Sequence, residues 1–322
     1  MGGSDPAHFS QSSCKRSKYM IPFQKLTAAQ KKQYEDILFS VPQRNCEYSF
    51  ANLFLWGRQQ AAFLHGCVAF FSHFNGRSVY PYPIGNGDKW KVVQLVLEDA
   101  RERGIPCRFT GMNEKDMAEL ESWFPGRFYF NCDRDGFDYV YETDALADLK
   151  GKKLQKKRNH FNRFRSQHPD YRVEPLSCAN MEHARHMVND WYQNRMREDP
   201  QGNYLLENIA LARAFRHFEE LEMEGLVLLE GDTVLAVTMG SRLGEDIFDI
   251  HFEKAREDVD GAYTAINCEF ARYLRLKYPQ VRFLDREDDL GLEGLRKAKL
   301  SYYPHHLAEK CWAYEKEDIY ED

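Results

Sequence analysis

The chain has 322 residues, enough for two domains that each bury a core of their own. Hydrophobic residues make up 43% of the sequence and aromatic residues 14%, a composition that excludes an intrinsically disordered protein. The net charge of −6 argues against attraction of nucleic acid by the whole molecule, although a local basic segment can still bind it.

The cysteines are scattered and form neither a CxxC pair nor the Cys/His spacing of a zinc site. We therefore expect free thiols, a reducing compartment and a cytoplasmic protein. No apolar run is long enough to span a membrane, and the N-terminus lacks the apolar core of a signal peptide. The cysteines are Cys14, Cys46, Cys67, Cys107, Cys132, Cys178, Cys268 and Cys311.

The first 19 residues are polar and without pattern, so we expect a disordered tail at 1–19. Strand and helix patterns then alternate through residue 142. Helices are expected over 27–41, 48–59, 90–103 and 113–124, and strands over 61–85 (two, turning at Asn75-Gly76), 105–112 and 127–142 (two, turning at Asp135-Gly136).

A basic segment, 143–168, is expected to form one long helix that connects two halves of the chain. The second half repeats the alternation of the first. Strands are expected at 171–176, within 225–255 (three), at 281–284 and at 305–317, and helices at 178–198, 206–223, 262–274 and after the glycines 291 and 294.

The element order of the second half is β, α, α, β, β, β, α, β, α, β, which resembles the GNAT acyltransferase fold. Three motifs sharpen the resemblance: YSFANLFLW at 48–56, LKGKKLQKKRNHFNRF at 149–164 and REDDLGLEGLRKAKLSYYP at 286–304. Together they resemble the C-terminal domain family of phosphatidylglycerol lysyltransferases. The resemblance implies an α/β (α+β) fold with two tandem GNAT-like domains, 20–142 (degenerate) and 169–322, joined by the basic helix.

The resemblance also implies a transferase that moves an aminoacyl group from aminoacyl-tRNA to an amine or hydroxyl acceptor. The full lysyltransferases carry a multi-helix membrane portion that this sequence lacks, so a stand-alone soluble copy can use an acceptor other than lipid. Two alternatives stay open: an acyl-CoA-dependent N-acyltransferase, and a non-catalytic module that binds a polyanion. No metal or other cofactor is required by these activities.

The strand at 247–255 alternates, with Asp249, His251 and Glu253 opposite its aromatic and aliphatic residues. In the GNAT fold this is the central fourth strand, so we expect the three ionisable groups to line a cleft and to serve acid/base catalysis. Glu253 or His251 would take the proton of the acceptor, and Lys254 or Arg286 would stabilise the oxyanion. A solvated strand face or a satisfied polar network is the alternative.

The donor is expected near Tyr263, Asn267 and the helix that carries Arg296 and Lys299, which lie three residues apart on adjoining helix positions. They can hold a phosphate or a terminal ribose, or instead form a salt-bridge cluster with the acidic residues nearby. The loop 256–261, where GNAT relatives hold pyrophosphate, is acidic and lacks their glycine-rich basic signature. This loop disfavours an acyl-CoA donor.

The basic helix carries eight lysine and arginine residues and no acid between 150 and 165. We expect Lys156, Lys157, Arg158 and Arg163 to contact a polyanion, either the tRNA backbone or anionic lipid headgroups. A solvated helix face is the alternative.

Overall fold

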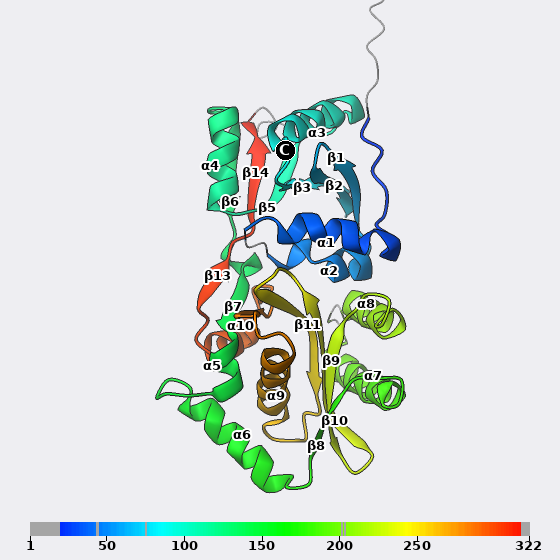
Figure 1. Ribbon diagram of the computed structural model, residues 1–322, viewed down its shortest axis with the longest axis vertical. Helices are drawn as coiled ribbons and strands as arrows, with labels where there is room; N and C mark the ends of the chain where they lie inside the picture. Colours follow the sequence, from blue (N-terminus) through cyan, green and yellow to red (C-terminus); the bar gives the residue numbers. More distant parts are fainter. Residues whose placement is uncertain (1–19, 43–44, 75, 201, 203, 317–322) are drawn as a thin grey trace, which may run out of the picture.

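Two mixed sheets, one above the other along the long axis of the molecule, organise the chain (Figure 1). The computed structural model describes residues 20–42, 45–74, 76–200, 202 and 204–316. The expected tail at 1–19 lies outside these residues. The predicted α/β class, with two mixed sheets flanked by helices, is confirmed.

The first sheet has seven strands in the order β1-β2-β3-β5-β14-β6, with β4 paired to β2, and only β3 and β5 are parallel neighbours among the described pairs. Its strands are β1 (Gln59–Leu64), β2 (Cys67–Phe74), β3 (Arg77–Pro81), β4 (Ile84–Gly85), β5 (Arg108–Met112), β6 (Phe128–Cys132) and β14 (Cys311–Glu315). The helical elements of this half are η1 (Ala28–Gln30), α1 (Lys31–Phe39), η2 (Cys46–Tyr48), α2 (Phe50–Trp56), α3 (Lys89–Arg103), α4 (Glu114–Trp123) and η3 (Arg134–Gly136).

The second sheet also has seven strands, in the order β13-β7-β12-β11-β10-β9-β8, and here β11 and β12 are parallel. Its strands are β7 (Asp138–Glu142), β8 (Arg172–Pro175), β9 (Glu224–Glu230), β10 (Thr233–Arg242), β11 (Ile247–Ala255), β12 (Phe283–Asp285) and β13 (His306–Ala308). The helices are α5 (Thr143–Asp148), α6 (Gln155–Gln167), α7 (Met181–Glu198), α8 (Leu205–Arg216), α9 (Ala262–Lys277) and α10 (Glu293–Leu300).

Local sequence signals explain where several helices begin and end. The side chain of Asn113 caps α4 by accepting a hydrogen bond from the backbone N–H of Asp116. The carboxylate of Asp116 in turn accepts a hydrogen bond from the backbone N–H of Asn113. Gly104 ends α3 with a φ of 67°, a left-handed conformation that glycine adopts without strain. The helix ends expected at these two residues are confirmed.

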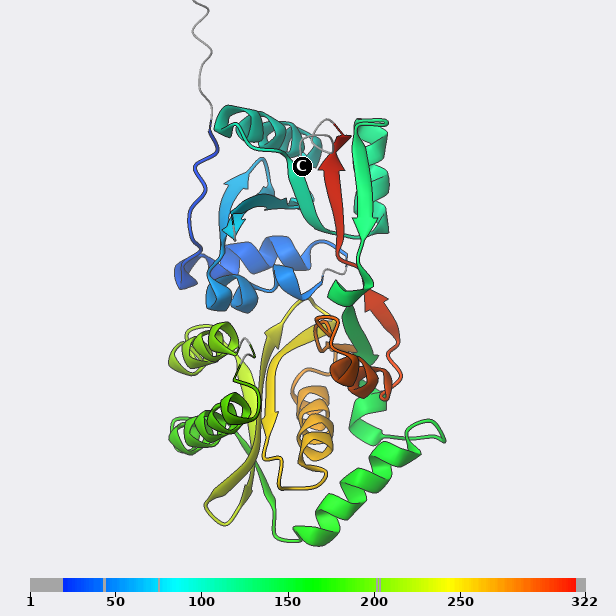
Figure 2. The same cartoon turned by 180° about the vertical axis from the view of Figure 1, so that it is seen from behind.

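Each sheet contains a strand that comes from the other half of the sequence. β7 pairs with β12 and β13 in the second sheet, while β14, at the end of the chain, lies between β5 and β6 in the first (Figure 2). The sequence patterns gave no sign of this exchange, because 127–142 reads as one hairpin and 305–317 as one strand. The chain therefore crosses twice between the sheets, and residues near these crossings can meet at their junction.

The single helix expected over 143–168 is wrong, because the structure contains two helices with a break between them. Leu149 and Gly151 have φ values of 50° and 83°, which are left-handed and cannot continue an α-helix. Arg158 then donates to the carbonyl oxygens of Leu149 (2.6 Å) and Gly151 (3.2 Å), so its guanidinium satisfies backbone groups that the break leaves open.

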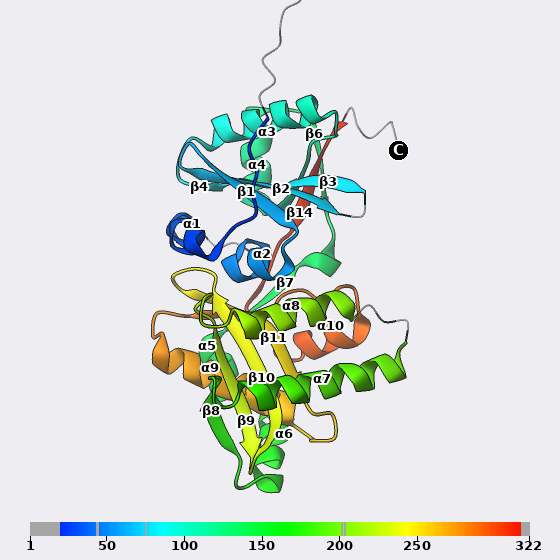
Figure 3. The ribbon, with the colours of Figure 1, turned by 90° about the vertical axis from the view of Figure 1, so that its right-hand side faces the viewer.

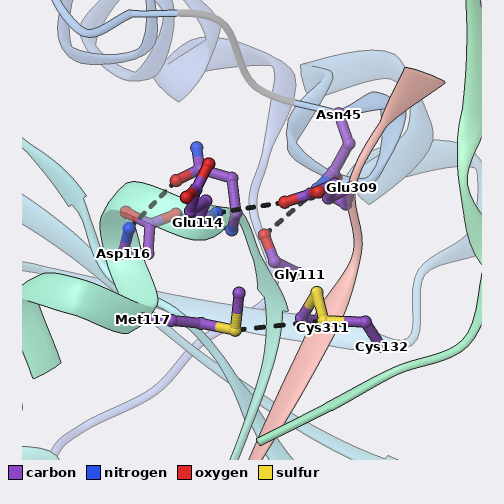
Figure 4. The surroundings of a disulfide bond; sticks show 9 residues. Asn45, Gly111, Glu114, Asp116, Met117, Cys132, Glu309 and Cys311 are labelled. Carbon is purple, nitrogen blue, oxygen red and sulfur yellow. Dashed lines mark hydrogen bonds between the residues drawn. A yellow bond between two sulfur atoms is a disulfide. The ribbon is translucent and has the colours of Figure 1, made fainter. Parts of the chain in front are cut away.

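The expectation of free thiols is wrong for Cys132 and Cys311, which form a disulfide between β6 and β14 (Figure 4). The two residues are direct cross-strand partners, with Cα atoms 4.3 Å apart. Nearby, the Asn45 amide donates to the carbonyl oxygens of Gly111 and Glu309, at 3.1 and 3.2 Å. The disulfide and this amide attach the C-terminal strand to the first sheet.

Helices cover both faces of the second sheet. α7 and α8 lie across one face (Figure 3), and α9 packs on the other together with α5 and α6. One cluster of buried side chains runs from α1 and α2 of the first half to α7 and α8 of the second. The two halves therefore share a core on that side, and α9 has a separate one.

Candidate functional site

β11 lies at the centre of the second sheet, but its alternation is interrupted. Two consecutive residues of β10 pair with Phe252 and Ile250, so His251 is left over as the extra residue of a β-bulge. A bulge reverses the face of every residue beyond it. Asp249 and His251 consequently lie on the face of α7 and α8, whereas Glu253 lies on the α9 face. The prediction that the three share one face is wrong.

Asp249 and His251 belong to a hydrogen-bonded network where the two halves meet. His251 Nδ1 lies 3.3 Å from Asp249 Oδ2 and 3.4 Å from Glu287 Oε1, and its Nε2 lies 2.8 Å from Ser241 Oγ. Asn52 of α2 donates to both carboxylates, at 3.4 and 3.0 Å. The side chains of Asp249 and His251 are fully buried.

The pKa values of the two carboxyl groups in this network shift in opposite directions. Burial raises the pKa of Asp249 well above its usual range, and the negative charges of Glu287 and Asp285 add to the effect. Burial also acts to raise the pKa of Glu287, but the hydrogen bond and charge of His251 outweigh it and lower that pKa. These opposite shifts favour the protonated form of Asp249 and the ionised form of Glu287.

A buried lysine compensates the acidic groups next to this network. Lys310, on the linker between β13 and β14, lies 2.6 Å from Asp138 Oδ1 and 3.1 Å from Asp288 Oδ2. The second oxygen of Asp138 accepts from the backbone N–H of Cys46 at 2.8 Å. The pKa of Lys310 is raised well above its usual value, since Asp138, Cys46 and other nearby acids outweigh the effect of burial. The junction is therefore held by charge as well as by packing.

Asp249, His251 and Glu287 also present ligand atoms within 4.8 Å of one another, which is close enough to hold a metal ion. The Asn52 amide donates hydrogen bonds to the carboxylates of Asp249 and Glu287. A bound cation would contact the same carboxylate oxygens in place of this amide. We interpret the group as a hydrogen-bonded network, and the metal-free mechanism stays a prediction.

A second group of polar residues lies on the α9 face. Arg286 donates to Glu253 Oε1 at 2.8 Å, and Asn267 of α9 lies 3.3 Å from the other carboxylate oxygen. The guanidinium of Arg286 lies 5.0 Å from the ring centre of Tyr302. On that ring, 3.9 Å from its centre, also lies the amino group of Lys157 from α6. We call Glu253, Arg286, Asn267, Tyr302 and Lys157 the α9-face site.

The α9-face site reaches solvent, whereas in the junction network Asp249 and His251 are enclosed and Glu287 is 24% exposed. The side chains of Glu253 and Arg286 are 10% and 15% exposed. Among the residues that the structure describes, no hydrogen-bond acceptor lies within reach of Arg286 Nη1, which is buried. Burial, with a smaller effect from the charge of Arg286, lowers the pKa of Lys157 to about 8. The site thus combines an unused donor with a lysine that titrates near neutral pH.

Lys254 and Tyr263 were predicted to bind substrate, and the structure places neither in the α9-face site. Lys254 points to the opposite face, where it lies 2.8 Å from Glu207 and 4.0 Å from the ring centre of Trp191. Tyr263, in the first turn of α9, is 38% exposed.

Arg296 and Lys299 bind the loop after β12. Arg296 makes two hydrogen bonds of 2.8 Å to Asp289 and a further one to Asp135. Lys299 donates to three consecutive backbone carbonyl oxygens, those of residues 286–288. These contacts fit the salt-bridge interpretation of this segment better than a phosphate site. They hold Arg286 and Glu287 in place, the latter with a φ of 58°.

The four basic residues expected to bind a polyanion have different surroundings. Lys157 belongs to the α9-face site, and Arg158 bonds to backbone oxygens at the helix break. Arg163 forms a 2.7 Å ion pair with Asp260 but stays 56% exposed. Lys156 is exposed to solvent. Contact with a polyanion by these residues remains a prediction.

Several residues of the two groups were not singled out from the sequence. Asn52 lies inside an aromatic motif that indicated packing, and Ser241 and Tyr302 lie in apolar surroundings. Asp138 and Lys310 lie on the segments that cross between the sheets. The motifs at 48–56 and 286–304 contain some of these residues, but nothing in their spacing shows that they meet.

The fold is an α/β fold with two mixed sheets, and residues 39–314 match the family model "Phosphatidylglycerol lysyltransferase, C-terminal". The chain belongs to this family. The predicted resemblance is confirmed.

Solved structures agree with this assignment. A conserved protein of unknown function from Bacteroides thetaiotaomicron is 37% identical, with a TM-score of 0.88 over 92% of this chain and 100% of that one. L-PGS from Bacillus licheniformis is 16% identical, with a TM-score of 0.67 over 91% of this chain and 93% of that one. At 13% identity and a TM-score of 0.63, the C-terminal domain of a putative lysylphosphatidylglycerol synthetase from Agrobacterium fabrum matches 89% of this chain and 92% of its own. The last two show a shared fold.

An uncharacterized protein of Mycoplasmoides gallisepticum is 26% identical over 176 residues, or 54% of each chain. The chain thus spans about half the length of this curated relative. In the part of the chain that the structure describes, no helix combines the length and apolar character needed to cross a membrane.

Proposed function

We propose that this protein transfers an aminoacyl group from aminoacyl-tRNA to an amine or hydroxyl acceptor at the α9-face site. The observation that carries the proposal is the buried Arg286 Nη1, which lacks an acceptor among the described residues while Nη2 holds Glu253. A fixed cationic donor of this kind stabilises the oxyanion that forms when an ester carbonyl is attacked. Family membership supports the same class of reaction.

The reaction assigns a role to each residue of the site. The acceptor oxygen or nitrogen attacks the ester carbonyl carbon, and Arg286 Nη1 bonds the developing oxyanion. Neutral Lys157 takes the proton of the acceptor, because a pKa of about 8 suits a base near neutral pH. The ester bond to the terminal ribose then breaks, and the ribose oxygen receives that proton. Glu253 and Asn267 hold Arg286 and the substrate in position.

Asp249 and His251 serve this site as positioning residues. They are enclosed at the junction, and their connection to the reaction runs through Glu287, the residue next to Arg286. His251 as the proton acceptor and Lys254 as the oxyanion donor, both considered from the sequence, lie on the wrong face of β11 for this role.

The structure favours aminoacyl-tRNA over acyl-CoA as donor. α6 packs on the end of the loop 256–261, at the start of α9, while residues 256–258 stay exposed. A Cβ added at Gly261 would lie 2.7 Å from the carbonyl oxygen of His160, so the helix packs directly on the loop. Arg163 of α6 pairs with Asp260 in the same loop. The loop where GNAT relatives hold pyrophosphate is therefore acidic, and α6 occupies the space at its end.

The exposed basic groups of α6 suit the phosphates of such a donor. Lys156 is exposed beside Lys157, and Lys152 and Lys153 precede it on the same surface. A tRNA backbone on this surface would bring its 3′ end toward the α9-face site. This use of α6 also agrees with a cytoplasmic protein, since charged tRNA is found there. An anionic lipid is the other candidate for this surface and for the acceptor.

Purified protein and a donor comparison test the proposal. The protein would be incubated with a pool of labelled aminoacyl-tRNA and, separately, with labelled acetyl-CoA, each with soluble amines and with phosphatidylglycerol vesicles. We expect label to leave the tRNA for an acceptor. Native mass spectrometry of the protein as purified would show bound tRNA and no CoA.

Two results would contradict the proposal. Turnover of acetyl-CoA alone would establish the N-acyltransferase alternative. Binding of tRNA without any transfer, from every aminoacyl-tRNA of the pool, would establish a non-catalytic polyanion-binding module.

A further inference from the structure

A cavity of about 590 Å³ lies in the first half, on the face of the first sheet that also packs against α1 and α2. This volume is typical of sites for small ligands. The cavity is built on β1, β2, β3, β5 and β14, whereas the α9-face site is built on the second sheet. The residues that line it include Arg58, Gln59, Ser72, Arg77, Thr110 and Trp312.

Strand pairing produces the floor of the cavity. Gln59, Ser72 and Val79 are direct cross-strand neighbours on β1, β2 and β3, so their side chains form a row on one face. Trp312 of β14 also lines the cavity. Its ring is stacked on that of Tyr314, with 5.7 Å between the ring centres and an angle of 10° between the ring planes. The floor thus offers an amide, a hydroxyl and an aromatic surface.

The charges around the cavity are mainly positive. Arg58 and Arg77 line it from the starts of β1 and β3. Lys310 and Glu47 also line it, but Lys310 is paired with Asp138, and burial raises the pKa of Glu47, which favours its uncharged form. The cavity is therefore lined by three basic side chains, Arg58, Arg77 and Lys310, and one acidic side chain, Glu47, in a protein whose net charge is −6.

We infer that this cavity binds a small phosphorylated ligand, at a site separate from the transfer reaction. Guanidinium groups bind phosphate oxygens through paired N–H donors, which makes Arg58 and Arg77 suitable for a phosphate group. Ser72 and Thr110 supply hydroxyl groups for a polar body of the ligand, and Trp312 supplies a surface for its carbon atoms. The first half thus has a binding function of its own.

Calorimetric titration of the full chain with glycerol 3-phosphate and with inorganic phosphate tests the inference, with glycerol as the uncharged control. We expect both phosphate compounds to bind and glycerol not to bind. Arg77→Gln, and Arg58→Lys as a milder change in a half-buried residue, should each weaken binding roughly tenfold, and together by more. Arg216→Gln, on an exposed position of α8, is the matched control and should bind like the wild type.

Cosedimentation with vesicles separates a soluble ligand from a lipid headgroup. Binding of glycerol 3-phosphate in solution identifies a soluble phosphorylated ligand. Binding only to phosphatidylglycerol vesicles, lost in Arg77→Gln and not in Arg216→Gln, identifies a headgroup in the same cavity. No binding of either, or equal binding by all variants, would overturn the inference. Neither assay uses tRNA or transfer, so the result is independent of the proposed function.

Discussion

Burial of Lys157 against the ring of Tyr302 gives this lysine a chemistry different from that of its neighbours on α6. Its pKa is lowered to about 8, so roughly a fifth of its population is neutral at pH 7.4. If it accepts the proton of the acceptor, the kcat/KM of transfer should rise with pH and level off above about 8.

Lys157→Arg tests this role because arginine keeps the charge but does not lose its proton in this range. We expect transfer to fall at least about 100-fold, and the remaining activity to lose the pH dependence near 8. Lys156→Arg, one residue away and exposed, should behave like the wild type. An unchanged pH profile in Lys157→Arg would exclude Lys157 as the base.

Asp249 and Glu287 should respond differently to amide substitution. Asn imitates a protonated carboxyl, so Asp249→Asn should change the free energy of unfolding by less than about 1 kcal/mol near pH 7. Glu287→Gln removes an ionised partner of His251 and should cost about 1–3 kcal/mol. Urea unfolding of both variants measures the difference, and equal costs would contradict the assigned protonation states.

The pH dependence of stability follows from the directions of the same two pKa shifts. The lowered pKa of Glu287 stabilises the fold above the unfolded-state pKa, and this contribution is lost as the pH falls through the folded-state value. The raised pKa of Asp249 acts in reverse, because stability falls as the pH rises from the unfolded-state value toward the folded one. Glu287→Gln should therefore unfold with a weaker dependence on acid than the wild type.

At the scale of elements, the packing of α6 on the α9 loop depends on one glycine. Gly261 and Gly151 both have a φ of 83°. A Cβ at Gly261 would meet the His160 carbonyl at 2.7 Å, whereas nothing lies within 4 Å of one at Gly151. Gly151→Ala should thus cost only the backbone strain, about 1 kcal/mol, and Gly261→Ala clearly more.

Hydrogen exchange of α6 amides distinguishes the two variants further. Gly261→Ala should increase exchange across α6, because the helix must move away from the loop, and Gly151→Ala should not. Equal stabilities and equal exchange would show that α6 is not docked on this loop.

The disulfide between β6 and β14 closes a sequence separation of 179 residues. Cross-links over long loops stabilise mainly by restricting the unfolded chain, so Cys132→Ser should lower the free energy of unfolding by about 2–4 kcal/mol. Cys178→Ser, which removes an exposed thiol, is the control. Thiol titration of the denatured, unreduced protein checks the bond itself, and reaction of every cysteine would contradict it.

The elements themselves were largely predictable, because periodicity is a local property. The strand at 247–255 was visible from its alternation, but the bulge at His251 was not, since it is set by the pairing of β10 with β11. Gly151 is a residue type that often ends a helix, and the break between α5 and α6 lies at this residue. The continuous basic charge of 150–165 nevertheless favoured the prediction of one helix. Which face Glu253 takes, and hence the composition of the site, follows from such pairings.

At the scale of the molecule, the motifs were enough to predict the family and the two-sheet fold. The exchange of β7 and β14 between the sheets was not predictable, because strand partners depend on contacts far apart in sequence. The junction network depends on this exchange, since it brings Asp138 and Lys310 together. The sequence pointed to β11 and the segment after β12 as the proposed reaction site, but only the structure separates these residues into two groups on opposite faces.

Single-turnover transfer from labelled aminoacyl-tRNA tests the central claim most directly. Arg286→Gln keeps a polar side chain but loses the cation that bonds the oxyanion, so the rate of ester cleavage into product should fall about 100-fold or more, with tRNA binding unchanged. Lys254→Gln, on β11 but on the face opposite the α9-face site, should transfer at nearly the wild-type rate. Equal rates for wild type and Arg286→Gln, or a loss confined to Lys254→Gln, would show that the reaction does not take place at the α9-face site.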